Sequence, residues 1–453
     1  MRHTKILTVA ALAALVIVSA CSKDKAIDTP AKLTPLPSPT LQVQRVWDTT
    51  VDEKKAAKLR LGLGISIEGN RVYAAGHKGD LVALDLANGH QIWRVNTRAP
   101  LSGGTAASAD MVMVGASDGQ LFAFTPEGKP RWNVRLNGEV LAAPTISAHL
   151  IAVRTVDGKL HALSPDNGKE LWVQEQQVPR LSLRGTARPV ISGDLVLCGF
   201  DNGKVLAVNT GDGSLLWEAT VTPPHGRTEL ERLADIDSAV GVSGHDVYAV
   251  GFQGRVAMLA LETGQIWWSH EASSYRGLTL DGDRLYVATA DGEVLALRAR
   301  TGVEIWRQKV LLHRGLSDVA VMDDALVIGD FQGYLHFLDK ETGALAARVQ
   351  TGKTRISTPP LVVGNMVVEV NDRGQLNAYK VTPRAGKAAA VIPPAKGGST
   401  AAAAAAPAAP PADGAASPAA SAAPAPGTPP ADGSAVPAPT PAAAPETPQP
   451  ESK

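Results

Sequence analysis

Few residues of this sequence have the types and spacing that catalysis or metal binding requires. The ten histidines are scattered, and the chain has no His-x-x-x-His or Cys-x-x-Cys metal spacing, no Gly-x-Ser-x-Gly elbow and no phosphate-binding loop. We interpret His313, the most prominent histidine, as a structural residue rather than a general base. Cys198 lies in an apolar, strand-like run and is predicted to be buried. The sequence therefore predicts no enzyme, no catalytic residues, and no metal or cofactor site.

A repeated pattern dominates the chain instead. It consists of Gly, then Ala four residues later, Gly at ten and Trp at fourteen, as in residues 292–306. Eight copies, 38 to 51 residues apart, begin at Gly79, Gly119, Gly158, Gly203, Gly254, Gly292, Gly333 and Gly374. Short alternating apolar runs joined by Asp-Gly or Thr-Gly turns indicate strands, and a period of about 40 residues is typical of four-stranded propeller blades.

The two ends of the repeat complete each other. Ala347 replaces the Trp of the seventh copy, and the eighth copy has no following Trp strand, whereas residues 42–48 form an isolated strand that carries Trp47. We therefore predict an all-β fold over residues 41–382, an eight-bladed β-propeller of four-stranded antiparallel blades. The N-terminal strand is expected to pair with the C-terminal blade, which leaves no open sheet edge. The Trp residues are assigned to packing between blades.

The segments outside the repeat differ in composition. Residues 1–20 have a basic start and a 15-residue apolar run, which is typical of a signal peptide, and the run ends at Cys21 in a pattern that resembles a bacterial lipobox. The alternative is an ordinary signal peptide with an incidental cysteine. Residues 21–40 are expected to be a lipidated Cys21 and a tether, and the Ala/Pro-rich residues 383–453 a disordered tail.

The irregular connections between blades point to a binding surface. Five run 24 to 27 residues from the Trp position to the next leading Gly, but those after Trp47, Trp172 and Trp217 take 32, 31 and 37. The last two belong to consecutive blades. In an up-and-down blade, both must emerge on one face. They carry apolar and charged residues that suit a protein–protein patch, namely Leu181, Leu183, Arg184, Asp235 and Asp237. In an alternative reading, Arg184 pairs with Asp235 or Asp237 and only holds the two loops together.

Charge limits the partners. The chain has 44 basic and 44 acidic residues, so its formal net charge is zero. This balance lacks the basic footprint of a nucleic-acid-binding protein, and we expect no nucleic acid as a partner.

Two resemblances follow from these motifs. Ala-x-Asp-x-x-x-Gly-x-x-x-Trp, as at residues 83–93, resembles the tryptophan-docking motif of quinoprotein dehydrogenases, which bind pyrroloquinoline quinone and Ca²⁺. The chain lacks the adjacent cysteine pair of those enzymes, so the resemblance carries the fold and not the activity. A quinoprotein-like dehydrogenase and a lipoprotein that binds cell-wall polymer through its tail remain the alternative functions.

The second resemblance is more specific. The lipobox, the Trp repeat, Leu-Ser-Leu-Arg-Gly at 181–185, Glu-Arg-Leu-Ala-Asp-Ile-Asp at 231–237 and Leu-Leu-His-Arg at 311–314 resemble the BamB family of outer-membrane protein assembly lipoproteins. So does Gly-Asp-Phe-Gln-Gly-Tyr-Leu-His at 329–336.

This resemblance implies a non-enzymatic scaffold in the outer membrane, lipid-anchored and facing the periplasm, that is a monomer within a complex. It also implies binding to the POTRA domains of a BamA-type subunit, assistance to nascent outer-membrane barrels, and partner contacts by the five loop residues named above.

Overall fold

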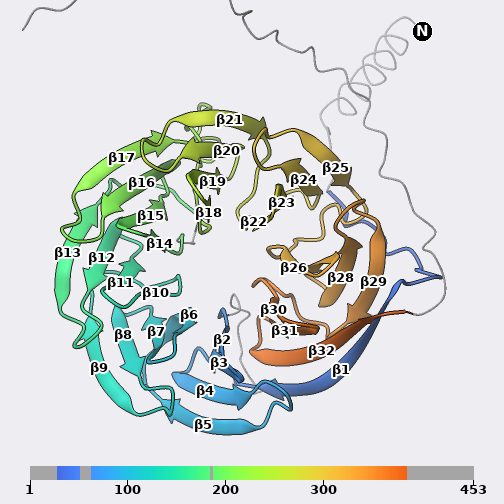
Figure 1. Cartoon of the computed structure of the whole chain (residues 1–453), viewed down its shortest axis with the longest axis horizontal. Helices are drawn as coiled ribbons and strands as arrows, with labels where there is room; N and C mark the ends of the chain where they lie inside the picture. The colour runs from blue at the N-terminus through green and yellow to red at the C-terminus, as the bar shows by residue number, and fades with distance from the viewer. Residues whose placement is uncertain (1–27, 52–62, 184–186, 385–453) are drawn as a thin grey trace, which may run out of the picture. The chain divides into compact units, whose positions relative to one another are not determined.

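Short apolar strands separated by glycine turns build a ring of eight four-stranded antiparallel sheets (Figure 1). This ring confirms the eight-bladed propeller expected from the repeat. The computed structural model describes residues 28–51, 63–183 and 187–384. The predicted signal peptide, Cys21, Arg184 and nearly all of the tail lie outside these residues. Among the described residues, no helix is long and apolar enough to cross a bilayer.

The blades follow one another along the chain, each running from the centre of the ring outward. Blade 1 consists of β2 (Ser66–Glu68), β3 (Arg71–Ala75), β4 (Asp80–Asp85) and β5 (Gln91–Asn96). Blade 2 consists of β6 (Leu101–Ala107), β7 (Val112–Ala116), β8 (Gln120–Phe124) and β9 (Pro130–Arg135). Blade 3 consists of β10 (Thr145–Ile146), β11 (Ile151–Arg154), β12 (Lys159–Leu163) and β13 (Glu170–Glu175). Blade 4 consists of β14 (Val190–Ser192), β15 (Leu195–Gly199), β16 (Lys204–Asn209) and β17 (Leu215–Thr220).

The second half of the ring has the same arrangement. Blade 5 consists of β18 (Gly241–Ser243), β19 (Asp246–Val250), β20 (Arg255–Ala260) and β21 (Ile266–Glu271). Blade 6 consists of β22 (Leu278–Asp281), β23 (Arg284–Ala288), β24 (Val294–Arg298) and β25 (Glu304–Gln308). Blade 7 is β26 (Ala320–Met322), β27 (Ala325–Gly329), β28 (Tyr334–Asp339), β29 (Leu345–Gln350). Blade 8 is β30 (Leu361–Val363), β31 (Met366–Val370), β32 (Gln375–Pro383) and β1 (Leu41–Thr50).

The seven tryptophans of the repeat hold neighbouring blades together. Each donates its indole N–H to a backbone carbonyl of the next blade, at 2.8 to 3.1 Å. Each ring also lies against a glycine of the next blade, nine residues after the leading glycine at Gly128 and ten residues after it in the other six cases. At Gly302, for example, φ is +68° and a Cβ would lie 2.5 Å from the Trp268 ring. Only glycine fits both the turn and the ring, which explains the Gly and Trp spacing.

The closing blade reproduces the register of the others. Trp47 on β1 lies opposite Ala378 on β32, beside a bulge in β1, just as Trp93 lies opposite Ala83 beside a bulge. This pairing confirms the predicted closure by the N-terminal strand. Between β32 and β1 the turn that would support a seventh-blade Trp is missing, because the two strands come from opposite ends of the chain. Ala347 therefore packs in a cluster with the first residues of β1, including Leu41 and Val43.

The residues before β1 also lie on the ring. Residues 30–40, which we call the strap, run beside β25 and β29 (Figure 1). Ala31 N–H donates to the Leu312 carbonyl (2.9 Å), and Thr40 N–H donates to the Ala346 carbonyl (2.9 Å). The sequence assigned this stretch to a tether, whereas the structure attaches it to blades 6 and 7 from Ala31 onward. Backbone hydrogen bonds of this kind leave no signal in the side-chain pattern.

Candidate functional site

The two long connections lie on one face of the ring. In these antiparallel blades, the connections that leave the fourth strands and the turns between second and third strands emerge together, on what we call the loop face. The backbone N–H of Leu183, in the connection after β13, donates to the carboxylate of Asp235, in the connection after β17. The structure thus brings together two segments that the sequence singled out by their length and by their apolar and charged residues.

Asp235 fixes the connection after β17 from its buried side. Its side chain is fully buried, and its backbone carbonyl accepts the Phe252 N–H at 2.9 Å. The next residue, Ile236, donates its N–H to the Phe200 carbonyl at 3.2 Å. Burial raises the pKa of the Asp235 carboxyl to about 6, against the opposing effect of the Leu183 N–H. Asp235 therefore positions the loops and does not itself present a surface.

Asp237, two residues further on, is half-buried. Burial raises the pKa of its carboxyl well above the ordinary value, and the nearby carboxylates of Asp235 and Asp201 raise it further. Its Oδ1 atom is buried and has no hydrogen-bond partner within the described part of the chain. Arg184 lies outside that part, so its predicted pairing with Asp235 or Asp237 stays a prediction.

A buried ion pair between Arg154 and Asp201 lies close to the two aspartates of the connection after β17. Arg154, the last residue of β11, contacts Asp201 at 3.0 Å, donates to the Gly199 carbonyl at 2.8 Å and lies 4.1 Å over the Phe200 ring. Both charged side chains are almost completely buried. The sequence analysis missed this pair. A signal existed, because Arg154 is the one charged residue among the last residues of the second strands, which are Ala75, Ala116, Arg154, Gly199, Val250, Ala288, Gly329 and Val370.

Apolar side chains project from the loops that the buried groups hold. Leu181 is 40% exposed, Leu183 is half-buried and Leu230 is 67% exposed. Leu230 was not among the predicted residues, although it belongs to the longest connection. Its carbonyl accepts a hydrogen bond from Gln253 (3.1 Å). Exposed apolar side chains mark a binding surface when several of them gather on one face, as Leu181 and Leu230 do on the two long connections.

The segment around Leu230 is ordered by its own turn. The Glu231 carboxylate accepts the backbone N–H groups of Arg227 (2.8 Å) and Thr228 (3.0 Å), and these bonds lower the pKa of Glu231. Arg232 N–H donates to the Thr228 carbonyl at 3.1 Å. Leu230 therefore extends from a fixed turn, which reduces the entropy lost when a partner covers it.

Groups suited to chemistry are sparse in the described residues. They contain no group of three or more His, Cys, Asp or Glu side chains arranged to hold a metal ion. Cys198 is buried as predicted, and burial raises the pKa of its thiol to about 11, so the reactive thiolate is scarce at neutral pH. His313 has a φ of +57° and donates its backbone N–H to the Asp291 carbonyl at 2.7 Å, so its backbone shapes a turn.

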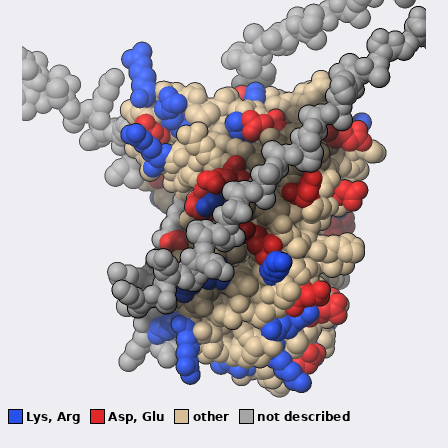
Figure 2. Space-filling view, turned by 90° about the vertical axis from the view of Figure 1, so that its left-hand side faces the viewer, with Lys and Arg blue, Asp and Glu red and all other residues tan. Residues whose placement is uncertain are grey.

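The outer side of the ring carries no dominant charge in the view that shows it. Around β9, β13 and β17, acidic and basic side chains are interspersed on a mostly uncharged surface (Figure 2). Such a surface does not produce the single-sign field that attracts nucleic acid.

Comparison with known proteins identifies the family to which this chain is similar. The sequence model described as outer membrane protein assembly factor BamB matches residues 41–100, 77–308 and 290–387. Outer membrane protein assembly factor BamB of Pseudomonas aeruginosa is 38% identical over 369 residues, which cover 81% of this chain and 97% of that protein.

Solved structures agree on the fold. The crystal structure of BamB from Moraxella catarrhalis has a TM-score of 0.68 at 26% identity, over 75% of this chain and all of that one. A europium-containing methanol dehydrogenase has a TM-score of 0.62 at 12% identity, over 75% of this chain and 93% of that one. At so low an identity, the second likeness extends to the fold alone.

Proposed function

Because this chain belongs to the BamB family of outer membrane protein assembly factors, we propose that it is a non-enzymatic scaffold lipoprotein of the barrel-assembly complex. In this role it binds the periplasmic POTRA domains of a BamA-type subunit and assists the folding and insertion of outer-membrane barrels. The observation that carries the proposal is the Leu183–Asp235 hydrogen bond, which joins two long connections into one surface with exposed leucines.

The residues of this surface have different tasks. Leu181, Leu183 and Leu230 supply apolar contact area, and Arg184 supplies a charge for orientation. Asp235 and Asp237 act from behind the surface, because Asp235 is fully buried and the Oδ1 atom of Asp237 is covered. Of the five residues expected from the sequence, this division keeps three as partner contacts and gives the two aspartates the loop-holding role that the alternative reading left open.

Membrane attachment through Cys21 limits where the scaffold can stand. Since the strap is attached to the ring from Ala31, about ten residues connect Cys21 to the folded body. Ten extended residues span at most about 35 Å. Lipidation at Cys21 would therefore hold the edge of blades 6 and 7 within roughly this distance of the membrane surface.

Charge introduced into the apolar surface tests the proposal. Leu181→Asp and Leu183→Asp should each abolish co-purification of the BamA-type subunit from detergent-solubilised membranes. The matched control is Val303→Asp, since Val303 is 61% exposed but lies in the turn before β25, away from the loop face. Thermal unfolding of all three variants should resemble that of the unmodified protein. Undiminished co-purification by both leucine variants would exclude this surface as the binding site.

A further inference from the structure

Two arginines of neighbouring blades hold the strap by its backbone carbonyls. Arg314, in the connection after β25, donates a hydrogen bond to the Ala31 carbonyl at 2.9 Å. Arg348, on β29, donates one to the Thr34 carbonyl, also at 2.9 Å. Between these contacts, Leu33 packs against the apolar cluster that joins blades 6 and 7. The attachment of the strap therefore depends on how the two guanidinium groups are oriented.

One buried network orients both guanidinium groups. Arg314 contacts a single carboxylate oxygen of Asp330 through Nε and Nη2, at 2.8 and 2.6 Å. Nε2 of His336, a fully buried residue of β28, lies 2.9 Å from the same oxygen. On the other side of the ring, Arg348 Nε lies 3.2 Å from His336 Nδ1. His336 thus connects the two arginines that hold the strap.

These contacts require a neutral imidazole with its proton on Nε2. The Asp330 carboxylate only accepts hydrogen bonds, so the ring donates from Nε2, and the Arg348 guanidinium only donates, so Nδ1 accepts. A second proton on His336 would occupy Nδ1 and turn this hydrogen bond into a contact between two donors of like charge. Arg348 would then have to leave the ring, and the Thr34 carbonyl would lose its donor.

Titratable and charged groups face His336 from several elements. Asp330 lies in the turn between β27 and β28, and the centroid of the Tyr334 ring, on β28 itself, lies 6.1 Å from that of the imidazole. Arg314 faces it from the connection after β25, and Arg348 faces it from β29. Two guanidinium groups and one carboxylate therefore act on the protonation of this ring.

The balance of these groups favours the neutral ring. Burial lowers the pKa of His336, and Arg348 and Arg314 lower it further, against the opposing effect of Asp330. Lys32, the charged side chain of the strap, is exposed to solvent. The strap itself contributes backbone carbonyls to the two arginines, and its closed position keeps both cations close to the imidazole.

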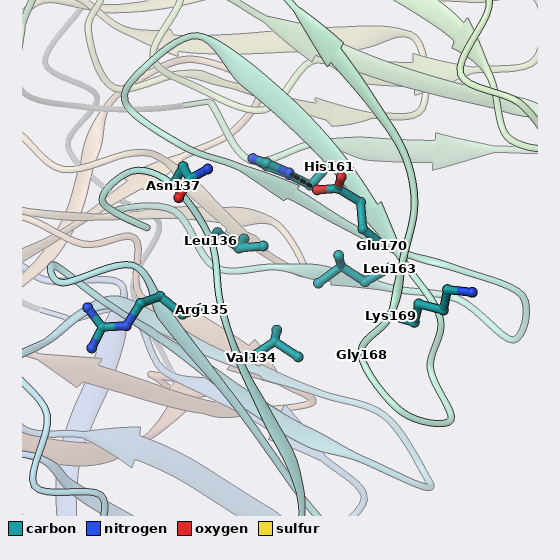
Figure 3. Close-up of a pocket in the computed structure, with 9 residues that line it drawn as sticks. All are labelled: Val134, Arg135, Leu136, Asn137, His161, Leu163, Gly168, Lys169 and Glu170. Carbon is teal, nitrogen blue, oxygen red and sulfur yellow. Dashed lines mark hydrogen bonds and ion pairs between the residues drawn. The ribbon is translucent and has the colours of Figure 1, made fainter. Parts of the chain in front are cut away.

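The equivalent histidine of blade 3 has a different neighbour. His161 and His336 each lie three residues after the leading glycine of their blade. In the pocket between blades 2 and 3, His161 Nδ1 lies 2.7 Å from the Glu170 carboxylate, as the dashed line in Figure 3 shows. A carboxylate at Nδ1 accepts a hydrogen bond from the neutral or the protonated ring. His161 is therefore a matched control, a buried histidine whose Nδ1 faces an acid instead of an arginine.

We propose that the strap is a pH-sensitive latch, which is closed while His336 is neutral and is released when His336 takes up a second proton. On release, Arg348 leaves the imidazole, and the Thr34 carbonyl exchanges this donor for water. Because the closed state resists the second proton, the open state binds more protons. Acid therefore favours opening as the pH falls below about 6.5, the ordinary pKa of histidine.

Release of the latch would lengthen the chain between Cys21 and the ring. With the strap closed, the first backbone hydrogen bond to the ring is made by Ala31, and with the strap open the free chain extends to Thr40. About 20 extended residues span at most about 70 Å, twice the reach of the closed form. This consequence rests on the proposed lipid anchor, whereas the latch itself does not.

Hydrogen–deuterium exchange of the purified full-length protein measures the latch. The amides of Ala31 and Thr40 donate hydrogen bonds to the ring, so their protection factors, corrected for the intrinsic effect of pH on exchange, report strap opening. Between pH 7.5 and 5.5 we expect the protection of Ala31 to fall by up to about tenfold, the largest change that one proton with an ordinary pKa near 6.5 permits. Amides within β27 and β28 should keep their protection.

Matched variants assign the effect to one histidine. His336→Gln cannot take up the proton, so the protection of Ala31 should be the same at the two pH values. His161→Gln, the same substitution at the equivalent position, should retain the change seen in wild type. Arg348→Met removes the donor that conflicts with the protonated ring and should give low protection at both pH values. It provides the test if His336→Gln does not fold.

Three results would overturn the proposal. They are protection of Ala31 that does not depend on pH in the wild-type protein, a pH dependence that His161→Gln removes or that persists in His336→Gln or Arg348→Met, and an equal loss of protection in β27 and β28. The last result would mean that acid loosens the whole ring and not the strap. Failure of the proposed membrane anchor would change none of these measurements, because they require no lipid.

Discussion

Trp47 faces Ala378 across the β1–β32 pair and donates its indole N–H to the Leu86 carbonyl of blade 1 at 2.9 Å. One residue near the start of the ring therefore joins the last blade to the first. Its ring covers Gly89, where a Cβ would lie 2.6 Å away.

Trp47→Ala should reduce the free energy of unfolding by about 3–5 kcal/mol, because it empties a tightly packed space at the seam of the ring. Urea denaturation followed by circular dichroism measures the loss. Trp267→Ala is the control, since Trp267 is 59% exposed on β21, and its loss should be below about 1 kcal/mol. Equal losses for the two variants would argue against a structural role of the seam.

Arg154→Met should cost about 3–5 kcal/mol of stability, because it leaves Asp201 buried without its cation. Combining it with Asp201→Asn should recover part of the loss, which a double-mutant cycle measures. Arg298→Met removes an exposed pair with Asp283 and should cost less than about 1 kcal/mol. A cycle without coupling would contradict the importance of the buried pair.

Glu369→Gln should change how stability depends on pH. Glu369 is fully buried beside Asn377, which donates to it at 2.6 Å, and burial raises the pKa of Glu369 to about 8. The folded chain then keeps a proton that the unfolded chain releases near pH 4.5, so this group's contribution to stability is lost as pH rises from about 4.5 to 8.

The Gln variant should lack that loss. Relative to wild type, its free energy of unfolding should therefore rise by on the order of 3 kcal/mol as the pH is raised from 5 to 8. Urea unfolding at both pH values measures the difference. Glu262→Gln, at an exposed carboxyl, should follow the wild-type profile. A Glu369→Gln profile parallel to wild type would show that Glu369 is ionised in the folded protein.

Arg348→Ala should loosen the strap, since it removes the hydrogen bond to the Thr34 carbonyl. Trypsin should then cleave after the exposed Lys32 several times faster, because a protease requires a locally released chain. Mass spectrometry of timed digests measures the rate, and Arg298→Ala is the control. An unchanged rate at Lys32 would show that Leu33 and Ala31 hold the strap without Arg348.

The proposed scaffold function predicts that Leu230→Ser weakens binding of the BamA-type subunit by about tenfold or more. Thermal stability should stay unchanged, because the side chain is exposed in the free protein. Titration of purified POTRA domains measures the affinity, with Val303→Ser as the control. Full affinity in the serine variant would place the contact at Leu181 and Leu183 alone.

The repeat predicted the architecture well because its residues act locally and recur. Gly302 and Trp306 are constrained by the same turn and ring contact in blade after blade, so spacing alone identifies the strands and the closing role of Trp47. The length of the connection after Trp217 likewise located the loop face, since eight similar blades define a normal loop.

Other features could not be predicted from the sequence, because they depend on partners that are distant along the chain. Arg154 and Asp201 form a pair only once blades 3 and 4 are adjacent, and either residue alone resembles a surface charge. The strap is held through backbone carbonyls of Ala31 and Thr34, which every residue possesses. The exposure of Leu230 depends on a turn capped by Glu231, which hydrophobic patterning does not reveal.

The pairing of β1 with β32 also sets the order in which the ring can be completed. β1 is synthesised first, but its partner is the last strand of the ring, so it must wait with unpaired backbone groups and an uncovered Trp47. Contacts between such distant segments form slowly, because most of the chain must be confined before they are gained. A truncated or stalled chain that lacks β32 cannot pair that first strand, so we expect proteases to cleave incomplete copies faster than finished ones.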